Sequence, residues 1–298
     1  MQIGIFGFES KVDAVVEEIA TAAGQGFSSF WVPQIFGFDA LTALAIAGRE
    51  VPEIKLGTSV IPTYPRHPMM LAQQALTVSQ VIGGGRLQLG IGLSHKPVVE
   101  GMWGMPFDKP VRHMREYLEL LGPMLHDQRV SASYDTLTAR GQLDIPDAEP
   151  PAVLVAALGP QMLKVTGRLA DGTITWMTGA KTIAELTVPT ISEAAAAAGK
   201  AAPEIVVGLP ICVTEEVDAA RQRAAKEYEI YGTLPSYRAM LDNEGLGGPE
   251  DLALIGDPSE IRDRLAVFEE GGMTTFAASS FGSESERAAT REFLQSLL

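Results

Sequence analysis

The sequence predicts an α/β fold, a (β/α)8 TIM barrel with insertions in which residues 1–298 form a single domain. Eight short apolar runs, rich in β-branched, aromatic and leucine residues, predict strands. Each run is followed by apolar residues at helical spacing, which predict the crossovers that parallel strands require. A chain of 298 residues is ordinary for such a barrel. The alternative is an open doubly wound sheet, which usually has about five to seven strands.

The predicted strands are mostly continuous apolar runs, as expected for parallel strands buried on both faces. They span residues 2–6, 27–32, 54–60, 86–91, 152–156, 172–176, 204–213 and 273–279. Gly24 predicts the end of the first helix, and Pro68 and Pro110 predict first helical turns. The predicted helices span residues 11–24, 38–50, 67–81, 107–125, 159–170, 180–199, 214–232, 256–272 and 283–298. Residues 126–151, which are polar and lack a helical period, and residues 232–258, which add an extra helix, are predicted insertions.

Charge and cysteine content narrow the class of protein. The net charge is -14, from 23 basic and 37 acidic residues. A surface this acidic argues against nucleic acid or an anionic membrane as the main partner. The one cysteine, Cys212, lies in an apolar run and predicts a buried packing residue. The N-terminal residues lack a basic segment followed by a long apolar one, and no run approaches the length that spans a bilayer. We therefore expect a cytoplasmic protein.

The active site of such a barrel lies where the strands end and the loops begin. Those positions contain no HExxH motif, no metal-ligand cluster, no GxSxG elbow and no paired carboxylates, so no metal site is predicted. They offer hydroxyls, backbone groups and the side chains of Phe8, Phe36, Trp176 and Met177. This composition favours a large, flat, partly apolar cofactor that brings its own chemistry.

A phosphate on that cofactor needs backbone N–H groups at a helix N-terminus. The stretch ALGPQMLK (157–164) offers one such terminus, and TGAKT (178–182) offers a second with the charge of Lys181. In the alternative interpretation, Gly159 and Pro160 only begin a helix. The stretch RLQLGIGLSH (86–95) is not a dinucleotide loop, because a GxGxxG motif would need glycine at position 95 and would follow the first strand.

Four stretches resemble the luciferase-like monooxygenase superfamily, in its deazaflavin-dependent oxidoreductase branch. They are LGTSVIPTYPRHPMMLAQQALTVSQVIGGGRLQLGIGLSH (56–95), EGMWGMPFDKPVRHMREYLELL (100–121), AALGPQMLKVTGRLADGTITWMTG (156–179) and IGDPSEIRDRLAVFEEGGMTTF (255–276). The resemblance implies a bacterial-luciferase-like barrel with coenzyme F-420, or alternatively FMN, across the ends of the strands. It also implies a non-prolyl cis peptide at Ser59–Val60 that backs the cofactor ring. A homodimer is expected, as in relatives.

The resemblance implies the following cofactor-binding positions: Gln34, Ser59, Val60, Gly92, Leu93, Ser94, His95, Ala157, Leu158, Gly159, Pro160, Trp176, Thr178 and Gly179. His95 is the best-placed titratable group and the candidate catalytic acid or base. His67 is expected to begin a helix, and His113 is expected at the surface or in an interface. Phe8, Phe36 and Trp103 are candidate walls of a substrate pocket.

The expected function is hydride transfer between F-420 and a small organic substrate. An FMN-dependent monooxygenase and a cofactor-free barrel that acts as a binding protein are the alternatives.

Overall fold

Eight parallel strands form a closed barrel in the computed structural model, which describes all 298 residues. The barrel closes because the first strand pairs with the second on one side and with the last on the other. The strands, in order round the barrel, are β1 (Gln2–Phe6), β2 (Ser29–Val32), β3 (Lys55–Thr58), β5 (Leu87–Gly92), β8 (Ala152–Val155), β9 (Gly172–Trp176), β10 (Glu204–Val213) and β12 (Thr275–Ser280). The (β/α)8 prediction is confirmed.

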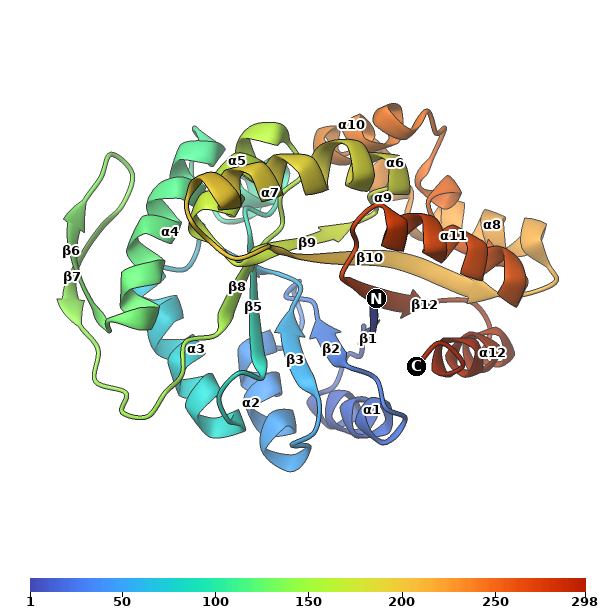
Figure 1. Ribbon diagram of the computed structural model, residues 1–298, viewed down its shortest axis with the longest axis horizontal. Helices are drawn as coiled ribbons and strands as arrows, with labels where there is room; N and C mark the ends of the chain where they lie inside the picture. Colours follow the sequence, from blue (N-terminus) through green and yellow to red (C-terminus); the bar gives the residue numbers. More distant parts are fainter.

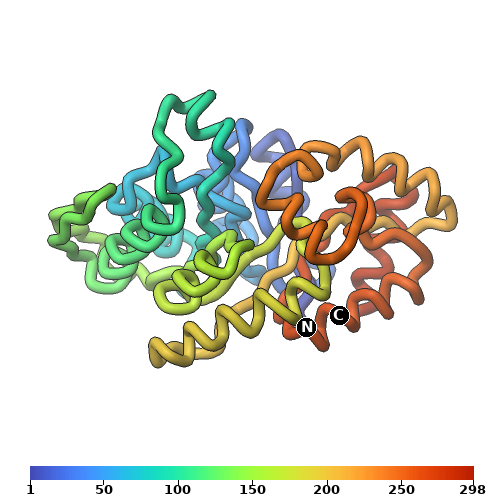
Figure 2. Tube along the Cα trace, turned by 90° about the horizontal axis from the view of Figure 1, so that it is seen from above, coloured from blue at the N-terminus to red at the C-terminus, as the bar shows by residue number.

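Helices surround this barrel (Figure 1). They are α1 (Val12–Gly24), α2 (Ala40–Glu50), α3 (Pro68–Ile82), α4 (Pro110–His126), α5 (Pro160–Leu169), α7 (Val188–Ala197), α11 (Pro258–Glu270) and α12 (Glu284–Gln295). The last helix packs beside the first, where Arg291 of α12 binds Glu18 of α1 at 3.0 Å. The two ends of the chain accordingly lie near each other in Figures 1 and 2. None of the helices has the length and apolarity that a bilayer crossing requires.

The longer connections carry further elements. They are β4 (Ile61–Pro62), the π-helix η1 (Pro97–Met102), β6 (Arg129–Ser133), β7 (Thr138–Gln142), α6 (Ala180–Thr182), the π-helix η2 (Ile183–Thr187), α8 (Val217–Glu227), α9 (Glu229–Thr233), α10 (Pro235–Glu244), the 3-10 helix η3 (Pro249–Asp251) and β11 (Leu254–Gly256). The predicted extra helix of residues 232–258 is α10.

The predicted insertion at residues 126–151 contains an antiparallel hairpin, β6–β7, that stands outside the barrel beside α4 (Figure 1). Each strand of the hairpin buries a single residue, Val130 or Ala139. The turn of the hairpin is tied to α4 by the buried carboxylate of Glu116, which accepts from the N–H of Thr136 at 2.8 Å. The polar sequence hid these strands because so little of either strand enters a core.

The barrel interior has its own small core, separate from the larger core between strands and helices. Its six members are Phe6, Trp31, Leu154, Ile174, Val206 and Ala277. Trp31 has room because β3 carries glycine beside it: a Cβ on Gly57 would lie 2.2 Å from the Trp31 ring. Val60 and Trp176 pack onto this interior core and are themselves only partly buried. They therefore form an apolar floor to the mouth of the barrel.

Candidate functional site

Val60 forms part of the floor because β3 ends at Thr58, before the predicted end of this strand. The strand predicted for residues 54–60 ends at Thr58, and the chain resumes pairing with β5 only at Ile61. Between these points the Ser59–Val60 peptide is cis, as the family resemblance implied. Thr58 anchors the start of this bulge by donating its hydroxyl to the carbonyl oxygen of Gly90 at 2.8 Å.

The two glycines of β5 make room for this bulge. A Cβ on Gly90 would lie 1.9 Å from the carbonyl oxygen of Thr58, and one on Gly92 would lie 2.6 Å from Cγ2 of Val60. Both distances are far below van der Waals contact. The two glycines thus let β5 lie close to the end of β3. This close approach fixes the position of Val60 at the mouth of the barrel.

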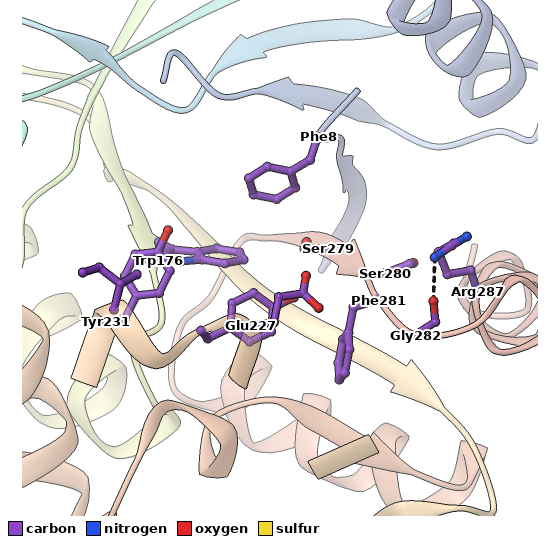
Figure 3. A pocket seen from close by; sticks show the side chains of 11 residues that line it. Phe8, Trp176, Glu227, Tyr231, Ser279, Ser280, Phe281, Gly282 and Arg287 are labelled. Atoms are coloured by element: carbon purple, nitrogen blue, oxygen red, sulfur yellow. Dashed lines mark hydrogen bonds between the residues drawn. The ribbon is translucent and has the colours of Figure 1, made fainter. Parts of the chain in front are cut away.

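A cavity of about 400 Å³ opens beside the floor, at the ends of β1, β9 and β12 and against α8 and α9 (Figure 3). Its aromatic lining consists of Phe8, Trp176, Tyr228, Tyr231 and Phe281. Its polar lining consists of Glu227, Ser279, Ser280 and Arg287. The sequence predicted Phe8 and Trp176 at the mouth. It gave no role to Glu227, Tyr228 or Tyr231, because residues 214–232 predicted one unbroken helix.

Aromatic rings connect this cavity to His95. The ring of His95 lies 5.8 Å from that of Tyr237 on α10, Tyr237 lies 5.0 Å from Tyr231, and Tyr231 lies 6.1 Å from Trp176. Burial lowers the pKa of His95, so its imidazole is neutral at pH 7. Burial also raises the pKa of Tyr231 and Tyr237, which keeps both phenols protonated. His95 is thus a neutral imidazole beside one protonated phenol, that of Tyr237.

The N-terminus of α5 offers backbone N–H groups that no side chain caps. Gly159 occupies the N-cap position of α5 and Pro160 its first turn, with no side chain capping the exposed N–H groups. A Cβ on Gly159 would meet nothing within 4 Å. Ala157 is buried and Leu158 half-buried in the turn that leads to this helix.

The turn after β9 is different, because a carboxylate already fills it. Oε1 of Glu244, at the end of α10, accepts from the N–H of Thr182 at 2.6 Å. A Cβ on Gly179 would lie 2.3 Å from the carboxyl carbon of Glu244. Thr178 and Gly179 are buried behind this contact. An anion is therefore accommodated better at α5 than at residues 178–182.

The remaining predicted residues lie apart from the cavity. Oε1 of Gln34 accepts from the N–H of Ala40 at 2.7 Å, so this amide helps to begin α2. Phe36 is 63% exposed in the loop after β2. Trp103 is half-buried at the end of η1. Leu93 and Ser94 are half-buried after β5, where Ser94 has a left-handed backbone.

A second cluster of polar rings lies next to β4. The imidazole of His113 stacks on Tyr64 with ring centroids 4.1 Å apart, and its Nε2 lies 3.1 Å from Oγ1 of Thr63. His113 is 6% exposed, so its predicted surface location was wrong. The helical pattern did not reveal that the residues after β4 cover this face of α4. His67 does begin a helix, because Nδ1 accepts from the N–H of Met69.

The mouth therefore combines an apolar floor, an aromatic cavity and an uncapped helix N-terminus. The sequence model described as "Luciferase-like monooxygenase" matches residues 7–275. The chain belongs to this family.

Luciferase-like relatives of this chain include proteins described with different cofactors. A putative coenzyme F-420-dependent oxidoreductase of Mycobacterium tuberculosis is 30% identical over 186 residues, which are 58% of this chain and 53% of the relative. The F-420-dependent tetrahydromethanopterin reductase of Methanopyrus kandleri superposes with a TM-score of 0.82 at 20% identity, over 99% of this chain and 97% of that one. The oxygenating constituent of 3,6-diketocamphane monooxygenase of Pseudomonas putida, in complex with FMN, gives 0.76 at 16% identity, over 99% and 96%. Proteins similar to this chain are thus described with F-420 or with FMN.

Proposed function

We propose that this protein is an oxidoreductase that transfers a hydride between coenzyme F-420 and a small organic substrate. The observation that supports this best is the floor of the mouth. Val60 and Trp176 present apolar surface above the interior core. Gly92, which has no side chain, leaves room for Val60 beside it. A flat ring system can cover such a floor without burying an unpaired charge.

The residues present fit a phosphate-bearing, ring-shaped cofactor. Nε1 of Trp176 is buried without a hydrogen-bond partner, so this donor is free for an acceptor on a bound ring. The uncapped N-terminus of α5 offers N–H groups to a phosphate. When bound, the deazaflavin would supply the centre that accepts or donates the hydride. The aromatic lining of the neighbouring cavity would keep water away from that centre.

We assign His95 the role of the proton-transferring group. Its neutral imidazole can accept a proton at pH 7, and burial makes the reverse donation by its imidazolium favourable. Replacing the imidazole by His95→Gln is expected to lower kcat by about 100-fold, the usual contribution of a general acid or base, with unchanged cofactor affinity. Steady-state kinetics and a cofactor titration measure the two effects. A variant that loses cofactor affinity but keeps kcat would assign His95 to binding instead.

The cofactor is tested by titrating the purified protein with F-420 and FMN separately and following fluorescence. Binding of F-420 in the micromolar range, with weaker binding of FMN, is the expected result. Binding of FMN alone, with reduced-flavin oxidation coupled to product, would instead make this chain a monooxygenase. Binding of neither would leave a barrel that acts as a binding protein.

A further inference from the structure

The cavity beside the floor has the composition of a cation site. Five aromatic rings line it, and they are in contact with one another: Trp176 lies 6.1 Å from Phe8 and 6.2 Å from Tyr228, and Tyr228 lies 5.9 Å from Phe281. Aromatic rings attract cations, and several rings around one space can recognise alkylated ammonium groups. The lining also contains a carboxylate, Glu227, which Figure 3 shows among the rings with its oxygens toward the space between Phe8 and Phe281.

The carboxylate of Glu227 has no cationic partner in the chain. Arg223, one helical turn earlier, binds Glu286 at 2.5 Å. Arg287 also lines the cavity, but its Nη1 donates to the carbonyl oxygen of Gly282 at 2.5 Å. In Figure 3 it lies beyond Ser280, at the end of the cavity away from Trp176. Glu227, which is exposed to solvent, is thus the one carboxylate of the cavity lining, and the positive charge of Arg287 lies at the other end of the cavity.

We propose that this cavity binds the substrate through a compact alkylammonium group, with the aromatic rings around the cation and Glu227 opposite it. This inference names the substrate class for the proposed oxidoreductase and rests on that function. A cavity of about 400 Å³ is large enough for a small molecule with such a group. The net charge of -14 supports it, because an acidic protein attracts cations from solution.

The test compares two probes of equal shape that differ in charge. Choline carries a trimethylammonium group, and 3,3-dimethyl-1-butanol replaces its nitrogen by carbon. Binding of each to the full-length protein without cofactor is measured by NMR titration at fixed ionic strength. We expect choline to bind at least about tenfold more tightly than the neutral probe, a preference of ordinary size for a cation held by aromatic rings and a carboxylate.

The variant Glu227→Gln is expected to reduce this preference to less than about threefold. The matched control is Glu229→Gln, because Glu229 is exposed two residues later on α9 and does not line the cavity. Trp176→Leu is expected to weaken choline binding more than binding of the neutral probe. Equal affinity for the two probes, or equal behaviour of the two glutamate variants, would overturn the proposal.

Cofactor binding is scored separately, by fluorescence with F-420 and FMN. Because the two probes are titrated without cofactor, the preference for the cation can fail while cofactor binds, and it can hold while cofactor does not. Failure of the substrate assignment is therefore distinguishable from failure of the proposed reaction.

Discussion

At the scale of single residues, the two glycines of β5 have unequal roles. A Cβ on Gly90 would collide with the Thr58 carbonyl, which belongs to backbone that pairs with Val32 of β2, whereas one on Gly92 would meet the side chain of Val60, which can move. We expect Gly90→Ala to lower the free energy of unfolding by about 3 kcal/mol and Gly92→Ala by about 1 kcal/mol. Urea unfolding followed by circular dichroism measures both values.

Because Gly92→Ala displaces Val60 in the floor, it is also expected to weaken cofactor binding while the fold persists. Gly24→Ala serves as the control, because a Cβ there meets nothing within 4 Å and Gly24, the last residue of α1, does not line the cavity. Equal losses of stability in the Gly90 and Gly92 variants would contradict the interpretation that backbone approach decides the difference.

The buried imidazole of His113 predicts an acid-sensitive contribution to stability. Burial lowers the pKa of His113 to about 4, from an ordinary value of 6.5, although Glu116 opposes the shift. Between these pH values the unfolded chain binds more protons than the folded one, so stability falls as the pH drops from 6.5 towards 4. The resulting loss in the free energy of unfolding, relative to pH 7, reaches about 3 kcal/mol at pH 4.

The measurement is the difference in unfolding free energy between the native protein and His113→Gln, taken at pH 7 and at pH 4. Glutamine can still face Thr63 but does not titrate, so the difference isolates the imidazole from the carboxylates that protonate in the same range. A difference that stays constant with pH would show that the imidazole is not held neutral.

At the scale of elements, the N-terminus of α5 is the candidate phosphate site. Gly159→Asp would place a carboxylate at an open N-cap position, where it stabilises the helix but repels a phosphate. We expect unchanged or higher thermal stability, together with at least about tenfold weaker binding of the phosphate-bearing cofactor. Gly159→Asn caps the helix without charge and should bind cofactor nearly as well as the native protein. If riboflavin, which lacks the phosphate, loses as much affinity as FMN, the phosphate does not lie at α5.

The helices and strands also show which parts of the fold could be predicted from the sequence and which could not. All eight barrel strands were predicted because a strand buried on both faces must be a continuous apolar run, as in EIVVGLPICV (204–213). The strands β4 and β11 have only two and three residues, too few for any period to appear. The candidate site was predicted only where strands end. Glu227, Tyr228 and Tyr231 reach the cavity through the break between α8 and α9 at Tyr228, and no glycine or proline at that residue signals the break.

At the scale of the whole molecule, the charge of -14 acts on every ligand that approaches the mouth. The long-range field repels an anionic cofactor, although the local contacts at α5 attract its phosphate. Salt screens the long-range field first, because the Debye length falls from about 30 Å at 0.01 M to about 8 Å at 0.15 M. We therefore expect the association rate constant of FMN to rise by about two- to fivefold over this range of salt, measured by stopped-flow fluorescence.

The same field predicts opposite behaviour for ligands of opposite charge. Riboflavin, which carries no phosphate, should associate at a rate that is independent of salt, so it reports any effect of salt on the protein itself. Choline is attracted by the field and by Glu227, so its affinity should fall as salt is added. A rate constant for FMN that also falls with salt would mean that local positive groups, such as Arg287 and the end of α5, outweigh the net charge at the mouth. The direction of the salt effect thus tells whether the cofactor meets the whole molecule's charge or the field of its own binding site.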